Sequence, residues 1–197
     1  MREHVLIPGP VGVIETVIEM PAIQPVGLAL IAHPHPLYGG TMNNKVVTTL
    51  AKLMREHGHI TVRCNFRGVG QSQGKHDAGI GETDDLHAVT DHLSAHHPGL
   101  AWSLLGFSFG AFVQKRLSTR IAAQRLLMVA PAVSIRPFGT PGTAAHIFQG
   151  DADEIIPLAA VVQYARREAI PLTVIPGASH FFHGKLLELR EAVRAVI

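Results

Sequence analysis

The chain has 197 residues, of which 47% are hydrophobic and 16% are charged, and its formal net charge is +2. A chain of this length and apolar content can bury one sizeable core, so we expect a single domain over residues 1–197. The sparse, nearly balanced charge lacks the dense basic surface of a nucleic-acid-binding protein. A small molecule is therefore the expected partner.

The sequence also bears on the compartment. Cys64 is the only cysteine and cannot form an intramolecular disulfide. The first ten residues, MREHVLIPGP, lack the long apolar stretch of a signal peptide, and no apolar run reaches the roughly 18 to 20 residues of a membrane span. We expect a soluble cytoplasmic protein with no membrane partner, and nothing in the sequence indicates an oligomeric state.

Short apolar runs predict the strands. Most of them are continuous rather than alternating, which is typical of strands covered on both faces. In chain order the runs occupy residues 13–19, 27–33, 60–64, 101–106, 125–130, 145–149 and 171–175.

Helical patterns lie between these runs. The pattern over 46–54 follows a possible N-cap at Asn43 or Asn44 and ends at Gly58. The next opens with GETDDL, whose negative charges suit the positive end of a helix dipole. Strands that alternate with helices predict a parallel α/β sheet, with functional groups at the carboxyl ends of the strands. Three more helical patterns follow: one over residues 111–123, one that begins at Pro157 and one over residues 185–197.

Residues 106–110 read GFSFG, directly after a strand-like run and directly before a helical pattern. This is the setting of a nucleophile elbow, which makes Ser108 the candidate nucleophile. The glycines leave room for the tight turn that such an elbow requires. The backbone N–H of Phe109 is the first candidate donor to an oxyanion.

A serine hydroxyl becomes a good nucleophile when a histidine takes its proton and a carboxylate orients that histidine. After a nucleophile elbow, the acid precedes the histidine in the chain. Residues 92–150 contain no Asp or Glu, so the acid must come later. Only His180 and His183 follow the first acidic cluster, so one of them is the expected base. The candidate acids are Asp151, Asp153, Glu154, Glu168, Glu188 and Glu191.

Position narrows both choices. We prefer Asp153 because it lies in a loop three residues beyond Gly150, past a strand end; Asp151 and Glu154 then face solvent or cap the loop. We prefer His180 because it follows a Pro-Gly turn among small and aromatic residues. His183, one helical turn further on, is the alternative.

Taken in order, these motifs resemble the α/β-hydrolase superfamily, and specifically its small lidless bacterial branch related to dienelactone hydrolases and serine carboxylesterases. The resemblance rests on AHPHPLYGGTMNNK, NFRGVGQSQG, GFSFG, GDADEIIP and GASHFF, and it covers most of the chain. It implies an eight-stranded, mostly parallel sheet with helices on both faces and no lid domain. The resemblance also implies that Ser108 is the nucleophile, Asp153 the acid and His180 the base.

The resemblance also implies a second oxyanion donor in the loop 33–40. Pro34 and Pro36 have no N–H to offer, so the backbone N–H of His35 is the first choice and that of Leu37 the second. His33 and His35 also suggest a metal pair, but no carboxylate or cysteine completes a ligand set. We expect neither a metal nor another cofactor.

Two further features bear on the substrate. About fifteen residues rich in Pro and Gly separate the runs 125–130 and 145–149, where many relatives insert a lid, so we expect an open cleft suited to small or short-acyl esters. The acid-free stretch 92–150 carries five cations, which either favour an anionic acyl substrate or decorate a solvated helix surface. These cations are Lys115, Arg116, Arg120, Arg125 and Arg136.

The predicted function is hydrolysis of small carboxylic esters through an acyl-enzyme. Alternatives on the same three residues are cleavage of thioesters, lactones or amides, and acyl transfer to an alcohol. A non-catalytic binding module of the same fold is a further alternative. A nucleotide-binding protein is disfavoured because GVGQSQG, at 68–74, has neither the spacing nor the lysine of a phosphate loop.

Overall fold

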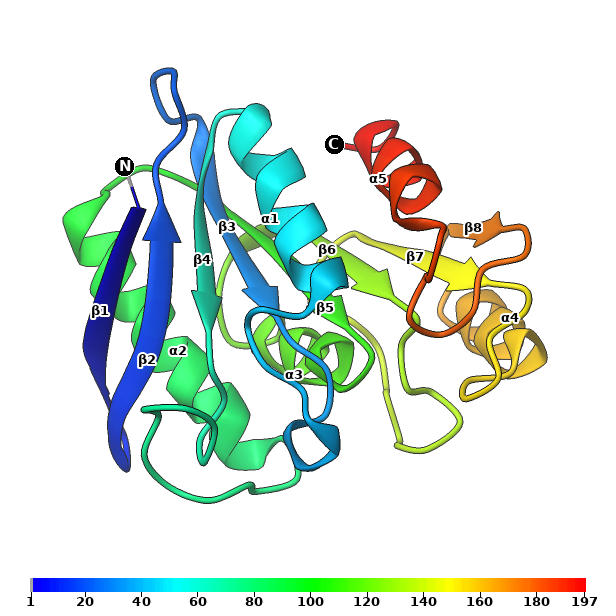
Figure 1. Ribbon diagram of the computed structural model, residues 1–197, viewed down its shortest axis with the longest axis horizontal. Helices are drawn as coiled ribbons and strands as arrows, with labels where there is room; N and C mark the ends of the chain where they lie inside the picture. Colours follow the sequence, from blue (N-terminus) through cyan, green and yellow to red (C-terminus); the bar gives the residue numbers. More distant parts are fainter. Residues whose placement is uncertain (1) are drawn as a thin grey trace.

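Eight strands form one sheet in the order β1-β2-β4-β3-β5-β6-β7-β8 (Figure 1). The computed structural model describes residues 2–197. The first three strands of that order pair antiparallel and the rest pair parallel, so the predicted mostly parallel eight-stranded sheet is confirmed. The strands are β1 (Arg2–Gly9), β2 (Gly12–Glu19), β3 (Gly27–Ala32), β4 (His59–Cys64), β5 (Trp102–Phe107), β6 (Ala123–Val129), β7 (Ala145–Gly150) and β8 (Leu172–Ile175).

Strand β1 has no counterpart among the seven runs found in the sequence. It forms a hairpin with β2 in which Gly9 pairs with Gly12, and Ile7 is its one fully buried side chain. An edge strand covers the core with one face only and tolerates a proline such as Pro8. Its sequence therefore carries little of the continuous apolar pattern that identifies a central strand.

Helices cover both faces of the sheet, as predicted (Figure 1). The apolar sides of α1 and α5 bury one core with residues of β3, β5, β6 and β7. The second core, on the opposite face, contains side chains of α2, α3 and α4. The helices are α1 (Lys45–Glu56), α2 (Ile80–His96), α3 (Phe109–Leu117), α4 (Leu158–Arg167) and α5 (Leu186–Arg194).

The sequence predicted the end of α1 correctly but placed the end of α3 too late. Helix α1 is capped by Asn44, whose side chain accepts a hydrogen bond from the N–H of Val46, and it ends before Gly58 as predicted. Helix α3 ends at Leu117, about six residues earlier than its pattern suggested. There the Ser118 hydroxyl donates to the carbonyl of Lys115 and accepts from the N–H of Gly142, which turns the chain toward β6.

The acidic start of α2 is used for specific contacts. Glu82 is fully buried and accepts hydrogen bonds from the N–H groups of Asp77 and Gly79. Asp85 is also buried and binds Arg67 through two bonds of 2.7 and 2.8 Å. These contacts hold the loop after β4 against α2, so the acidic residues do more than complement the helix dipole.

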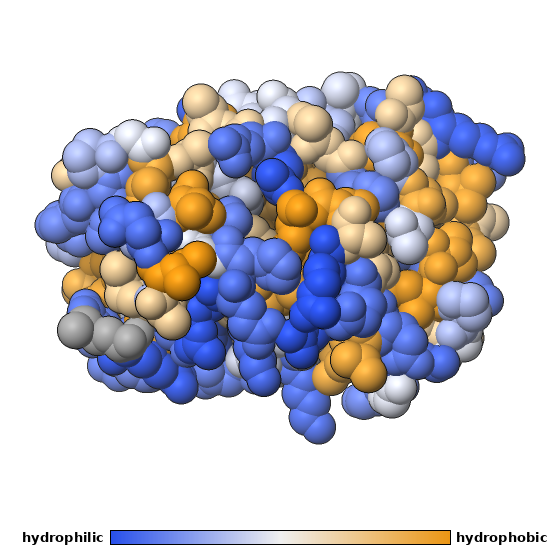
Figure 2. Space-filling model, turned by 90° about the horizontal axis from the view of Figure 1, so that it is seen from above, coloured by the Kyte–Doolittle hydropathy of each residue, from blue (hydrophilic) through white to orange (hydrophobic). Residues whose placement is uncertain are grey.

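The segment between β6 and β7, residues 131–144, contains no helix and inserts no lid. Within residues 2–197, none of the helices has the length and apolar character that crossing a bilayer requires. Seen from above the view of Figure 1, hydrophilic residues cover much of the surface and hydrophobic ones gather in patches between them (Figure 2).

Candidate active site

The turn from β5 into α3 forces Ser108 into a strained backbone conformation, with φ 55° and ψ −113°. A Cβ on Gly106 would lie closer than 3.0 Å to the backbone of Gly110, and a Cβ on Gly110 would lie equally close to the carbonyl of Ala32. Both glycines are therefore required by the close approach of backbone to backbone. The predicted strand–turn–helix setting of Ser108 is present.

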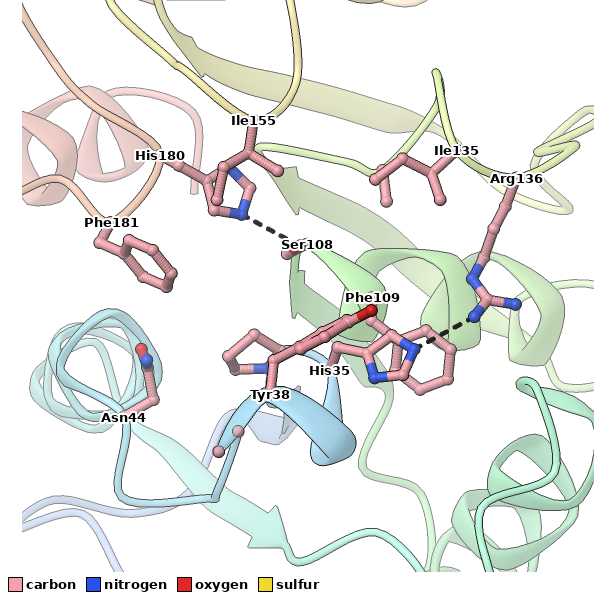
Figure 3. A pocket seen from close by; sticks show the side chains of 14 residues that line it. His35, Tyr38, Asn44, Ser108, Phe109, Ile135, Arg136, Ile155, His180 and Phe181 are labelled. Carbon is pink, nitrogen blue, oxygen red and sulfur yellow. Dashed lines mark hydrogen bonds between the residues drawn. The ribbon is translucent and has the colours of Figure 1, made fainter.

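Ser108, His180 and Asp153 form one hydrogen-bonded chain (Figure 3). The distance from His180 Nε2 to Ser108 Oγ is 3.1 Å, and that from His180 Nδ1 to Asp153 Oδ2 is 2.8 Å. The His180 side chain is almost fully buried. Because Nδ1 faces a carboxylate, it carries the proton, which leaves Nε2 free to accept the proton of the serine hydroxyl.

Asp153 is held by several donors at once. Its Oδ1 accepts from the N–H groups of Ile155 and Ile156, and its Oδ2 accepts from the side-chain amide of Gln149 at 2.8 Å. Burial raises the pKa of Asp153, but the hydrogen bond from His180 and those from the backbone outweigh it, so this pKa lies below its usual value. Asp153 therefore stays ionised. The role of Gln149 has no local signal in the sequence.

The neighbouring carboxylates bind backbone instead. Asp151 accepts from the N–H of Gly177 at 2.6 Å, and Glu154 accepts from the N–H of His180 at 3.1 Å. Both tie the loop after β7 to the loop after β8, which places Asp153 beside His180. The remaining candidate acids form ion pairs away from Ser108: Glu168 with Arg167, Glu188 with Lys185 and Glu191 with Arg194.

The loop after β3 turns tightly around His35. The N–H groups of Tyr38 and Gly40 donate to the carbonyl of His35, and the N–H of Leu37 donates to its ring Nδ1. Within residues 2–197 the backbone N–H groups of His35 and Phe109 have no hydrogen-bond acceptor. Of the two donors considered for this loop, His35 is the one left available.

His33 has a structural role. It is fully buried, and its Nε2 accepts from the N–H of Phe66 at 2.9 Å, so Nδ1 carries the proton and donates to the carbonyl of Pro34. Burial lowers the pKa of His33 to about 4, which keeps the ring neutral. Both ring nitrogens are thus occupied. Across residues 2–197, no three His, Cys, Asp or Glu side chains gather as a metal site would need.

A cavity of about 530 Å³ opens beside Ser108. Much of its surface is apolar, and exposed Ile135, Ile155 and Tyr38 border it (Figure 3). Arg136 belongs to the same wall; it lies in the segment 131–144 and not on a solvated helix surface. The lining consists of Pro34, His35, Tyr38, Gly39, Gly40, Asn44, Ser108, Phe109, Ala132, Ile135, Arg136, Ile155, His180 and Phe181.

Known proteins resemble this chain in both sequence and fold. Residues 37–147 match the protein family described as serine aminopeptidase, S33. An α/β serine hydrolase homologue from Coxiella burnetii is 45% identical, with a TM-score of 0.93 over 99% of this chain and 97% of its own. A lidless α/β serine hydrolase from Xanthomonas campestris is 38% identical, with a TM-score of 0.94 over 98% and 92%. An uncharacterized protein of Rickettsia prowazekii is 39% identical, over 84% of this chain and 76% of its own.

Proposed function

This chain belongs to the α/β-hydrolase superfamily of serine hydrolases, in the family described as serine aminopeptidase S33, and from that premise we propose that it hydrolyses small or short-acyl carboxylic esters. The observation that carries the proposal is the hydrogen-bonded chain from Asp153 through His180 to Ser108, which opens into a cavity. Ser108 is the proposed nucleophile, His180 the base and Asp153 the acid.

In the first half of the reaction, His180 Nε2 takes the proton of Ser108 as Oγ attacks the carbonyl carbon. The ionised Asp153 stabilises the imidazolium that forms. The imidazolium then donates its proton to the leaving alcohol, and the acyl group stays on Ser108. In the second half, water attacks this acyl-enzyme, with His180 again the base, and the acid is released.

The backbone N–H groups of Phe109 and His35 are the proposed oxyanion donors. Two features support this pair: neither group has another acceptor within residues 2–197, and Gly110 lets the start of α3 approach the backbone after β3. Backbone donors fixed before the reaction stabilise a developing oxyanion at no cost of reorganisation. Because the N–H of Leu37 already binds the His35 ring, we retain His35 over Leu37.

The cavity supports an ester over the amino-terminal peptide that the family description suggests. An aminopeptidase must bind the α-ammonium group of its substrate, and a carboxylate is the usual partner for such a cation. The lining of this cavity instead includes the guanidinium of Arg136, which would repel an ammonium group. Thioesters, lactones, amides and transfer to an alcohol use the same three residues and remain the alternatives.

The test is labelling with a fluorophosphonate, followed by intact-protein mass. Wild type is expected to gain one adduct, Ser108→Ala none, and the exposed control Ser134→Ala one. Hydrolysis rates for short-acyl esters, thioesters, lactones and amides then rank the acyl classes. A wild-type protein that takes no adduct and cleaves no ester would refute the proposal and favour a binding module of the same fold.

A further inference from the structure

Arg136 is held beside the reacting serine by aromatic and polar contacts. Its guanidinium lies 5.0 Å from the centre of the Phe109 ring and 5.6 Å from that of Phe112. It donates to the carbonyl of Ala78 at 3.3 Å and lies 3.2 Å from Nε2 of His35 (Figure 3). Cation–π contacts with two rings hold the guanidinium in the cavity wall.

These contacts leave the charge of Arg136 uncompensated. Within residues 2–197, no carboxylate oxygen lies within 4.0 Å of it, whereas Arg120, from the same acid-free stretch, pairs with Asp84. A guanidinium has five N–H donors in a planar fork, and the carbonyl of Ala78 accepts from one of them. The His35 ring does not compensate the charge: its Nδ1 accepts from the N–H of Leu37, so Nε2, the nitrogen nearest Arg136, carries the proton. Burial first, and then the charges of His76 and Arg136, lower the pKa of this ring, which favours its neutral form.

The position of Arg136 indicates which half of an ester it would meet. Ser108 lies between the His180 ring on one side and the Arg136 guanidinium on the other (Figure 3). His180 must reach the leaving oxygen to protonate it, so the alcohol part lies on the His180 side. The acyl part therefore extends toward Arg136.

We propose that Arg136 binds a carboxylate at the far end of the acyl chain, so that the preferred substrates are monoesters of short dicarboxylic acids. The proposal rests on the proposed esterase function and makes Arg136 a specificity-determining residue. A planar guanidinium that is held against aromatic rings suits bidentate binding of a carboxylate. The apolar lining between Arg136 and Ser108 then contacts the methylene groups of the chain.

The test compares monoethyl glutarate with its uncharged primary amide, which has nearly the same shape. Wild type is expected to show kcat/KM at least about tenfold higher for the carboxylate, the size of a charge-assisted hydrogen bond. Arg136→Gln should lower that value about tenfold and leave the amide within about threefold; Arg136→Lys should retain part of the preference. Arg166→Gln, an exposed arginine on α4, should change neither.

Equal rates for the two esters in wild type would overturn the proposal, as would equal losses for both in Arg136→Gln. A binding measurement keeps it separate from the proposed function. Calorimetry of monoethyl glutarate with Ser108→Ala, which needs no turnover, should detect binding that Arg136→Gln weakens about tenfold. If wild type hydrolyses no ester, the proposed function fails; if Arg136→Gln leaves this binding unchanged, the carboxylate site fails.

Discussion

Gly150 lies so close to Ala178 that a Cβ on Gly150 would come within 3.0 Å of the Ala178 carbonyl oxygen. That carbonyl accepts a hydrogen bond from the N–H of Ala152, so the end of β7 and the loop after β8 are joined backbone to backbone. Asp153 follows one side of this contact and His180 the other. The spacing between them thus depends on a residue that has no side chain.

Gly150→Ala is expected to separate the two loops, because neither backbone can move away without moving Asp153 or His180. We expect kcat to fall about a hundredfold and the free energy of unfolding to fall by about 1–3 kcal/mol. Ester hydrolysis and urea unfolding measure the two effects. Gly99→Ala is the control: its Cβ would meet nothing within 4 Å, although its φ is +83°, so it should lower stability and leave kcat unchanged.

Gln149→Met removes the amide that donates to Asp153 Oδ2. The carboxylate then loses one of the bonds that orient it toward His180, and kcat should fall about tenfold. KM should stay within about twofold, since Gln149 does not line the cavity. Gln114→Met, which removes a buried amide bonded to the carbonyl of Leu30, is the matched control. An unchanged kcat in Gln149→Met would mean that the backbone donors alone orient Asp153.

The burial of neutral His33 makes stability depend on pH. Its folded pKa of about 4 lies below the unfolded value of 6.5, so the unfolded chain binds the extra proton between these two pH values. The stability that depends on neutral His33 is therefore fully present above pH 6.5. The free energy of unfolding should fall by about 3 kcal/mol as the pH is lowered toward 4. Burial also lowers the pKa values of His59 and His146, which adds to the loss in the same direction.

Urea unfolding at several pH values measures this slope. His33→Gln should be less stable at pH 7 but should lose less stability on acidification than wild type. His96→Gln, an exposed histidine at the end of α2, should keep the wild-type slope. Equal slopes in wild type and His33→Gln would contradict the assignment.

The buried pair of Arg67 and Asp85 predicts a marked asymmetry between variants. Arg67→Met leaves the Asp85 carboxylate buried without its partner and should cost about 3–5 kcal/mol of unfolding free energy. The double variant Arg67→Met/Asp85→Leu should recover much of that loss. Arg120→Met breaks the exposed pair with Asp84 and should cost less than about 1 kcal/mol. Equal losses in the two single variants would contradict this account.

Local patterns made part of this molecule predictable from its sequence. Most of the seven strands found in the sequence are continuous apolar runs, and the order of Ser108, Asp153 and His180 follows from an elbow motif and a scarcity of acids. What the sequence missed depends on contacts between distant segments. Gln149 lies on a buried strand with no local signal of its role. Arg136 was one of five cations that the sequence could not distinguish, because its place in the cavity depends on contacts with Phe109 and Ala78.

The three proposed catalytic side chains follow three different strands. Ser108 follows β5, in the middle of the sequence, whereas Asp153 and His180 follow β7 and β8. A chain that had assembled the sheet only through β6 would contain the elbow without its proposed base. Trp102, the single tryptophan, is buried on β5 and reports that earlier stage. During refolding, tryptophan fluorescence should recover before esterase activity, so activity measures the completion of folding.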